Sequence, residues 1–136
     1  MNIALRLGLA ATLATSGYAH AYLYMHGYQH IPTIGPGFLI QGSAFIALAV
    51  LIAAGAPGWM TGLAGLGSAG ALAAFALSRT VGLFGFSERG WDPSPYASIS
   101  VVTELAAVVL ASVLLAKHVR RPAVTPTSRT EPLAQQ

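Results

Sequence analysis

The sequence predicts an all-α protein whose four transmembrane helices form an up-down-up-down bundle, and three observations carry this prediction. Of the 136 residues, 8% are charged and 54% are hydrophobic, whereas a soluble domain carries about 25% charged residues. Between Leu7 and Ser78 there is no Asp, Glu, Lys or Arg. Four apolar runs approach the roughly 20 residues that a helix needs to cross a bilayer. Lipid rather than water must therefore surround most of the chain.

The four helices are expected at residues 3–25, 38–56, 59–80 and 97–117, within a membrane domain of residues 1–118. Helix-breaking residues separate them: Gly27, Pro32, Gly35, Pro36 and Gly37 in the first loop, Pro57 in the second and Pro93 in the third. Such residues favour turns over continued helix. Residues 119–136 place several prolines among Ser and Thr, which predicts a disordered cytoplasmic tail.

The basic residues predict the orientation of the bundle. Arg6 precedes the first apolar run, and the chain after the last run carries Lys117, Arg120, Arg121 and Arg129. Cytoplasmic flanks of membrane helices are enriched in Lys and Arg. We therefore expect a multi-pass protein of the cell (plasma) membrane with both termini in the cytoplasm and with the first and third loops outside.

The first helix has an alternative interpretation as a cleaved signal peptide. Arg6, the apolar stretch after it and the triplet Ala19-His20-Ala21 resemble such a peptide with its cleavage site. Cleavage would leave three spans and an external amino end. Residues 22–25 continue the run to membrane length, which a signal peptide does not need, and this favours a retained helix.

A stripe of small residues marks the third helix. Its members recur at three- and four-residue spacing and are Gly58, Gly62, Gly65, Ala69, Ala73 and Ala76. Small residues let two membrane helices approach closely. The stripe therefore predicts tight packing within the bundle or, as the alternative, a homo-oligomer or membrane-complex interface, in addition to contact with the lipid bilayer.

Polar side chains from all four helices are expected to lie at one depth near the outer surface. With a rise of about 1.5 Å per residue, His20, Gln41 and Glu104 fall in the outer leaflet, and Arg79 lies at the outer end of its helix. Ser100 shares a helix face with Glu104. Because polar groups are costly in lipid, these side chains should turn toward one another.

The expected contact within this group is an ion pair between Arg79 and Glu104. A bidentate hydrogen bond would let both remain ionised and would partly offset their desolvation. His20 could then exchange a hydrogen bond with Glu104 and respond to pH. The pair would act either as a structural clamp between the third and fourth helices or as part of a site for a small ligand, ion or proton.

Other function classes find little support in the sequence. The chain has no cysteine, and no Ser stands in an activating motif, so it is not expected to be an enzyme or to hold a cofactor. The basic tail is scattered, which argues against nucleic-acid binding. His26 and His30 would share a helix face suited to a metal, but Gly27 interrupts the helix and no carboxylate is nearby. They are weak candidates, and no metal site is predicted.

Two motifs resemble those of a family of small four-helix integral membrane proteins common in actinobacteria. They are the residues Ile-Pro-Thr-Ile-Gly-Pro-Gly-Phe at 31–38 and Gly-Leu-Phe-Gly-Phe-Ser-Glu at 82–88. His20 in the first helix and Ser100 with Glu104 in the fourth complete the pattern. The resemblance implies the four-helix fold and an uncleaved first helix. It implies no activity, because the function of the family is uncharacterised.

Taken on its own, the sequence favours a structural or accessory membrane protein that assembles with other membrane proteins. The alternative is an outward-facing module that binds or transfers a small ligand, an ion or a proton through His20, Gln41, Arg79 and Glu104. The first interpretation predicts an Arg79–Glu104 clamp and a closed bundle. The second predicts a cavity that reaches Glu104 from outside.

Overall fold

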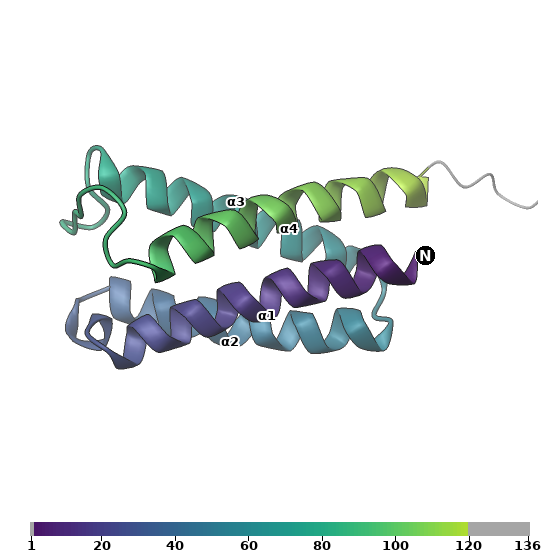
Figure 1. Ribbon diagram of the computed structural model, residues 1–136, viewed down its shortest axis with the longest axis horizontal. Helices are drawn as coiled ribbons and strands as arrows, with labels where there is room; N and C mark the ends of the chain where they lie inside the picture. Colours follow the sequence, from purple (N-terminus) through teal and green to yellow (C-terminus); the bar gives the residue numbers. More distant parts are fainter. Residues whose placement is uncertain (1, 120–136) are drawn as a thin grey trace, which may run out of the picture.

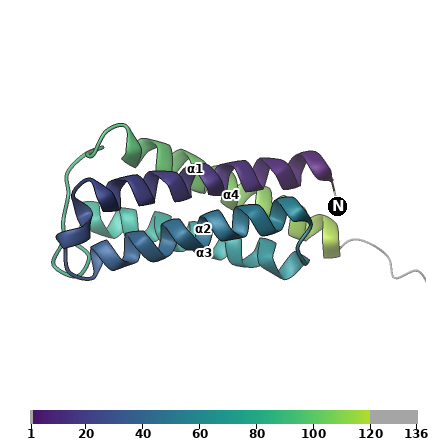
Figure 2. The same ribbon diagram turned by 90° about the horizontal axis from the view of Figure 1, so that it is seen from below.

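A computed structural model of the protein describes residues 2–119. Four long helices follow one another: α1 (Ile3–Met25), α2 (Ile34–Ala54), α3 (Gly58–Arg79) and α4 (Tyr96–Val119), with a short 3-10 helix, η1 (Tyr28–His30), after α1. They lie side by side along the longest axis (Figures 1 and 2). The expected all-α architecture with four helices is confirmed. The predicted tail lies outside the described residues except for Val119, which ends α4.

Three of these helices, α2, α3 and α4, are long and apolar enough to cross a membrane. The chain is therefore an integral membrane protein. Helix α1 has sufficient length, 23 residues, but it is not among the three. Its sequence carries hydroxyl and imidazole side chains such as Ser16 and His20, and both of these side chains are buried.

The two ends of the bundle differ in their connections. Residue 2 and the end of α4 lie at one end, which we call the terminal end (Figure 1). The α2–α3 turn at this end contains Gly55, whose φ of 99° suits a residue without a Cβ. The opposite end, which we call the loop end, carries η1 and the long connection of residues 80–95.

Helix α2 begins at Ile34, four residues earlier than the predicted start at residue 38. The prediction was wrong because Gly35 and Pro36 were taken as helix breakers. Proline is tolerated in the first turn of a helix, where its missing N–H would have had no intrahelical partner. Gly35 is needed there, since a Cβ would lie 2.5 Å from the carbonyl oxygen of Tyr28. The early start therefore packs η1 directly on α2.

An apolar core fills the terminal half of the bundle. Its buried members are Leu9, Ala10, Leu13, Phe45, Ala49, Ile52, Ala64, Ala107, Ala111 and Leu114. Helices α1 and α2 pack backbone to backbone where Gly17 meets Gly42, because a Cβ on Gly42 would lie 3.1 Å from the Gly17 carbonyl oxygen.

The small-residue stripe of α3 packs partly inside the bundle. A Cβ on Gly65 would lie 3.0 Å from the Cβ of Ala111 in α4, so the glycine lets these two helices meet. Gly62 faces open space. Intrabundle packing thus accounts for part of the stripe, and the oligomer interface stays a prediction.

Candidate functional site

Glu104 of α4 is the most deeply buried ionisable side chain of the loop half, with 2% of its surface exposed. Two neutral groups donate to its Oε1 atom: the Ser16 hydroxyl of α1 at 3.0 Å and the Gln41 amide of α2 at 3.2 Å. Three helices therefore converge on one carboxylate. A buried carboxyl group needs such donors, because an unpaired one would cost several kcal/mol.

His20 lies beside this carboxylate and its tautomer follows from its contacts. The Nδ1 atom is 2.9 Å from the carbonyl oxygen of Ser16. A carbonyl can only accept, so Nδ1 carries a hydrogen and donates it. The Nε2 atom then faces Glu104 Oε1 at 3.8 Å. Nε2 and the carboxylate are thus the two places between which one proton can be shared.

Ser100 lies one helical turn before Glu104 in α4, and its hydroxyl is buried without a hydrogen-bond partner among residues 2–119. An unsatisfied buried hydroxyl usually marks a place for water or a ligand. We call Ser16, His20, Gln41, Ser100 and Glu104 the polar cluster. Four of the five side chains expected to converge belong to this cluster together with Ser16, and all five line one cavity.

Arg79 is the fifth, and the predicted Arg79–Glu104 ion pair is wrong. The guanidinium pairs instead with Glu88, with Nη1 at 2.7 Å from Oε2. It also donates to the carbonyl oxygens of Gly90 and Asp92. The reason is geometric: Arg79 ends α3, and the connection that follows folds back over the bundle, so a carboxylate from this loop reaches the guanidinium.

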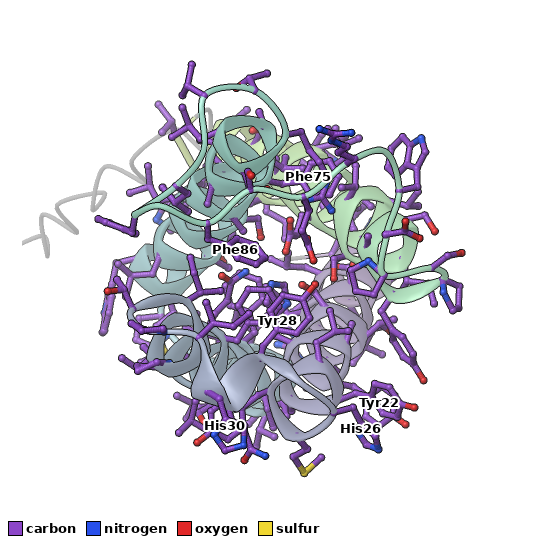
Figure 3. The ribbon with its side chains drawn as sticks, turned by 90° about the vertical axis from the view of Figure 1, so that its left-hand side faces the viewer. Tyr22, His26, Tyr28, His30, Phe75 and Phe86 are labelled. Atoms are coloured by element: carbon purple, nitrogen blue, oxygen red, sulfur yellow. The ribbon has the colours of Figure 1, made fainter. Side chains whose placement is uncertain are left out.

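Tyr28 joins this outer ion pair from η1. Its hydroxyl donates to the second carboxylate oxygen of Glu88, and its ring stacks on Phe38 with centroids 4.7 Å apart. Only 8% of Tyr28 is exposed. Figure 3 shows Tyr28 near the middle of the loop end, with Phe86 beside it. We call Tyr28, Arg79 and Glu88 the cap.

A tight turn explains how Glu88 reaches its position. Leu83 and Phe86 exchange backbone hydrogen bonds, and the two residues between them, Phe84 and Gly85, have φ of 51° and 79°. Positive φ at both central positions is the geometry of a type I′ turn. The Glu88 N–H then donates to the carbonyl oxygen of Ser78 at 3.0 Å. The backbone therefore fixes Glu88 beside the end of α3.

A cavity of about 90 Å³ lies between the polar cluster and the cap. The floor includes His20, Ser100 and Glu104, and the aromatic walls include Phe38 and Phe75. Since one water occupies about 30 Å³ of liquid, the space suffices for a few waters or a small ligand. Space of this size next to the unsatisfied Ser100 hydroxyl indicates a site that holds water or a small ligand.

His26 and His30 do not form a metal site with each other. The Nδ1 atom of His26 lies 2.8 Å from the carbonyl oxygen of Tyr22, on whose ring the imidazole stacks. Gly27, with φ of 148°, ends the helical path between the two histidines. Figure 3 shows them at separate places on the rim of the loop end. Within residues 2–119 no three metal-ligating side chains gather.

Replacing Tyr28 by Phe should lower the free energy of unfolding by about 1–2 kcal/mol, because a hydrogen bond to a charged group is lost. Burial and the neighbouring Glu88 raise the pKa of Tyr28 above its usual value. The native state therefore holds this proton more tightly than the unfolded state does, and stability should fall as the pH rises above about 10. Unfolding in detergent between pH 8 and 11 measures both effects. An equally steep decline in Tyr28→Phe would contradict the assignment.

Sequence reasoning missed Tyr28 and Glu88 as site residues. An aromatic residue just after a membrane helix, as Tyr28 is, ordinarily belongs to the lipid interface. A signal for Glu88 was present, since it ends the motif of residues 82–88 and is one of two carboxylates in the third loop. No sequence signal showed that the loop folds inward.

Comparison with protein-family models, with curated proteins and with solved structures found no match. The resemblance to the actinobacterial family stays a prediction. The chemistry of the site must therefore carry the functional argument.

Proposed function

We propose that this integral membrane protein binds a small cation, either a proton or a small protonated amine, in the cavity between the polar cluster and the cap. The observation that carries the proposal is Glu104, a buried carboxylate at the floor of a cavity whose direct donors, Ser16 and Gln41, are neutral. A positively charged ligand would supply the counter-charge that Glu104 lacks.

The distribution of charge supports a cation over an anion. Arg79 carries the positive charge nearest to the cavity mouth, but Glu88 neutralises it at 2.7 Å. At the floor, His20 balances Glu104 only when its Nε2 atom is protonated. The pair therefore holds one proton or, without it, one negative charge. A cation that displaces the proton restores the balance, which makes binding dependent on pH.

The walls of the cavity suit the same ligand. Aromatic faces attract ammonium groups, and this attraction grows when the cation is removed from water. Phe38 and Phe75 provide such faces between the cap and the floor. Toward the terminal end the apolar core, with Leu13 and Phe45 among its members, follows directly. A packed apolar layer below the site favours a dead-end binding site over a pathway through the bundle.

The accessory role, which the sequence favoured, predicts two features that differ from the structure. It predicts a clamp between Arg79 and Glu104, but Arg79 pairs with Glu88. It also expected a closed bundle, whereas Ser100 and Glu104 line a cavity. Assembly with other membrane proteins remains compatible with ligand binding, and the exposed part of the α3 stripe is the candidate surface for it.

The proposal includes four spans, with α1 retained, both termini in the cytoplasm and the cavity mouth outside. Helix α1 supplies Ser16 and His20 to the polar cluster, so cleavage after Ala21 would dismantle the site. Arg6 and Lys117 at the terminal end follow the bias of cytoplasmic flanks. The actinobacterial family, which the chain resembles, would share this topology in the cell membrane.

The test uses single cysteines in this cysteine-free chain. In intact cells, Ser100→Cys should react with small impermeant thiol reagents, and faster with a cationic reagent than with an anionic one, because Glu104 attracts positive charge. Adding Glu104→Gln should remove the preference. Ser94→Cys in the third loop is the positive control, and Leu110→Cys, deeper in α4, is the negative control. Silence at position 100 with labelling at position 94 would sink the proposal and favour the accessory role.

A further inference from the structure

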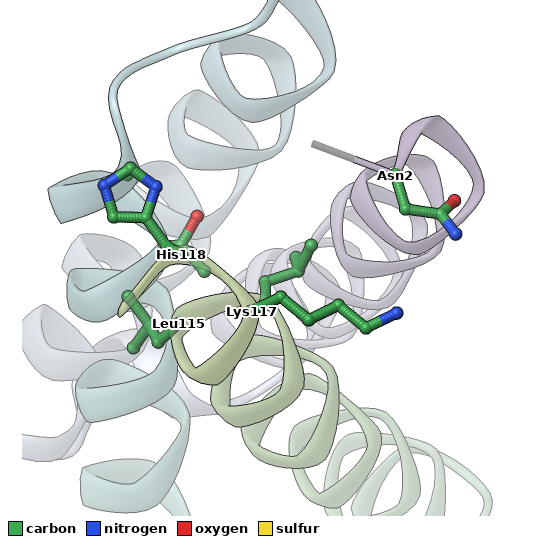
Figure 4. A pocket seen from close by; sticks show the side chains of 7 residues that line it. Asn2, Leu115, Lys117 and His118 are labelled. Atoms are coloured by element: carbon green, nitrogen blue, oxygen red, sulfur yellow. The ribbon is translucent and has the colours of Figure 1, made fainter. Parts of the chain in front are cut away.

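A second cavity lies at the terminal end, far from the polar cluster. It has a volume of about 230 Å³ and opens between the start of α1, the first turn of α3 and the last turn of α4 (Figure 4). Its lining residues are Asn2, Gly58, Thr61, Leu114, Leu115, Lys117 and His118. The proposed cation site does not involve any of them.

The backbone of α3 offers hydrogen-bond donors to this cavity. Helix α3 starts at Gly58, and the preceding Pro57 has no side chain that could cap it. The Met60 N–H donates to the carbonyl oxygen of Pro57. The N–H groups of Gly58 and Trp59 come before Met60 in the first turn of α3. The first N–H groups of a helix have no intrahelical acceptor, and together with the helix dipole they favour an anion.

The side chain of Thr61 is a second and independent indication of a ligand. Thr61 is only 3% exposed, yet it lines the cavity. Its hydroxyl makes no hydrogen bond within residues 2–119, whereas Thr12, Thr80 and Thr103 bond to their own helices. Asn2 caps α1 through Oδ1, which accepts from the Ala4 N–H at 3.0 Å, so its amide N–H groups are available as donors.

The ionisable side chains that line the cavity are both basic. Lys117 and His118 stand in the last turn of α4, and Figure 4 shows both projecting from it, with Asn2 on the neighbouring helix. The His118 ring lies about 4 Å from where a Cβ on Gly58 would be, so it reaches the start of α3. The described carboxylates, Glu88, Asp92 and Glu104, belong to the loop half.

From these observations we infer that the terminal-end cavity binds a phosphate-class anion through Thr61, Lys117, His118 and the first N–H groups of α3. The phosphate group comes either from the headgroup of an anionic phospholipid or from free inorganic phosphate. The Thr61 hydroxyl and the first N–H groups of α3 would donate hydrogen bonds to the phosphate oxygen atoms, and Lys117 would supply positive charge. At the membrane interface a headgroup phosphate would meet the cavity at the level of the last turn of α4.

The experiment uses the full chain in nanodiscs with Trp91→Phe, which leaves Trp59 in the first turn of α3 as the only tryptophan. Inorganic phosphate is titrated into phosphatidylcholine discs at constant ionic strength, and a second series replaces phosphatidylcholine by phosphatidylglycerol. Trp59 emission should change with saturation in at least one series. Thr61→Val and Lys117→Gln should each weaken binding by about tenfold.

Two matched variants make the result specific. Thr61→Ser keeps the hydroxyl and should bind like the parent, so a loss in Thr61→Val alone reports the hydroxyl rather than folding. Arg120→Gln with Arg121→Gln removes two tail charges outside the described residues and should leave saturation intact. Saturation by phosphate assigns the free ion, and saturation by phosphatidylglycerol alone assigns the headgroup. A flat response in both series, or equal binding by Thr61→Val and its parent, would overturn the inference.

Discussion

Replacing Glu104 by Gln should abolish cation binding while the bundle stays folded. Gln retains an oxygen that accepts from Ser16 and Gln41, and it fills the same space, so the free energy of unfolding should change by about 1 kcal/mol or less. In the parent, ammonium or methylammonium at about ten times Kd should raise that free energy by about 1.4 kcal/mol. The variant should show no such gain. Thermal unfolding in nanodiscs at constant ionic strength measures both quantities.

Two companion variants separate the charge from the hydrogen bonds. Glu104→Ala leaves the Ser16 hydroxyl and the Gln41 amide buried without their acceptor, which should cost about 2–4 kcal/mol. Glu88→Gln removes a carboxylate from the cap instead of the floor, and the response to ammonium should persist. Ammonium stabilisation of Glu104→Gln equal to that of the parent would place the cation elsewhere and refute the proposed function.

Removing Arg79 should open the cap. Its guanidinium holds Glu88 and also the carbonyl oxygens of Gly90 and Asp92, so one side chain ties the third loop to α3. Arg79→Ala should lower the free energy of unfolding by about 2–4 kcal/mol, because hydrogen bonds to charged groups contribute about 1.5–3 kcal/mol each and solvent access reduces that. Hydrogen exchange across residues 83–92 should accelerate, and Ser100→Cys should react faster with thiol reagents.

Matched substitutions test whether loop closure depends on the several hydrogen bonds that the Arg79 guanidinium donates at once. Arg79→Lys keeps a positive charge near Glu88 but cannot reach the two carbonyl oxygens at the same time, so it should fall between the parent and Arg79→Ala. Arg89→Ala removes an exposed positive charge from the same loop and should change little. Equal exchange rates in Arg79→Ala and Arg89→Ala would show that Arg79 does not hold the loop closed.

The sequence predicted the helices better than the contacts between them. Apolar runs and breakers placed α1 and α3 to within one residue at each end, because membrane helices must satisfy their own backbone. Helix rise also gave the depth of His20, Gln41 and Glu104, which the structure brings together. The rise per residue fixes the position of a side chain along the helix axis, but it does not predict the path of a loop.

Arg79 shows this limit. At the end of a helix its long side chain can turn down toward Glu104 or out toward the connection, and the depth argument considered only the first. The I′ turn at Phe84 and Gly85 decides the matter by folding Glu88 back onto the helix end. Long-range geometry of this kind depends on a few backbone angles in the loop, and composition does not reveal them. Pro36 made the predicted start of α2 too late, because proline breaks a helix in its interior but is tolerated in its first turn.

The meeting of Gly17 and Gly42 bears on how the chain enters the membrane. Alone in lipid, α1 would expose Ser16 and His20 to hydrocarbon, and it is the helix with the weakest apolar character of its own. Docked backbone to backbone on α2, it covers part of that polar surface with a strongly apolar neighbour. In the four-span topology proposed above, we therefore expect α1 to integrate stably only together with α2, as one helical hairpin.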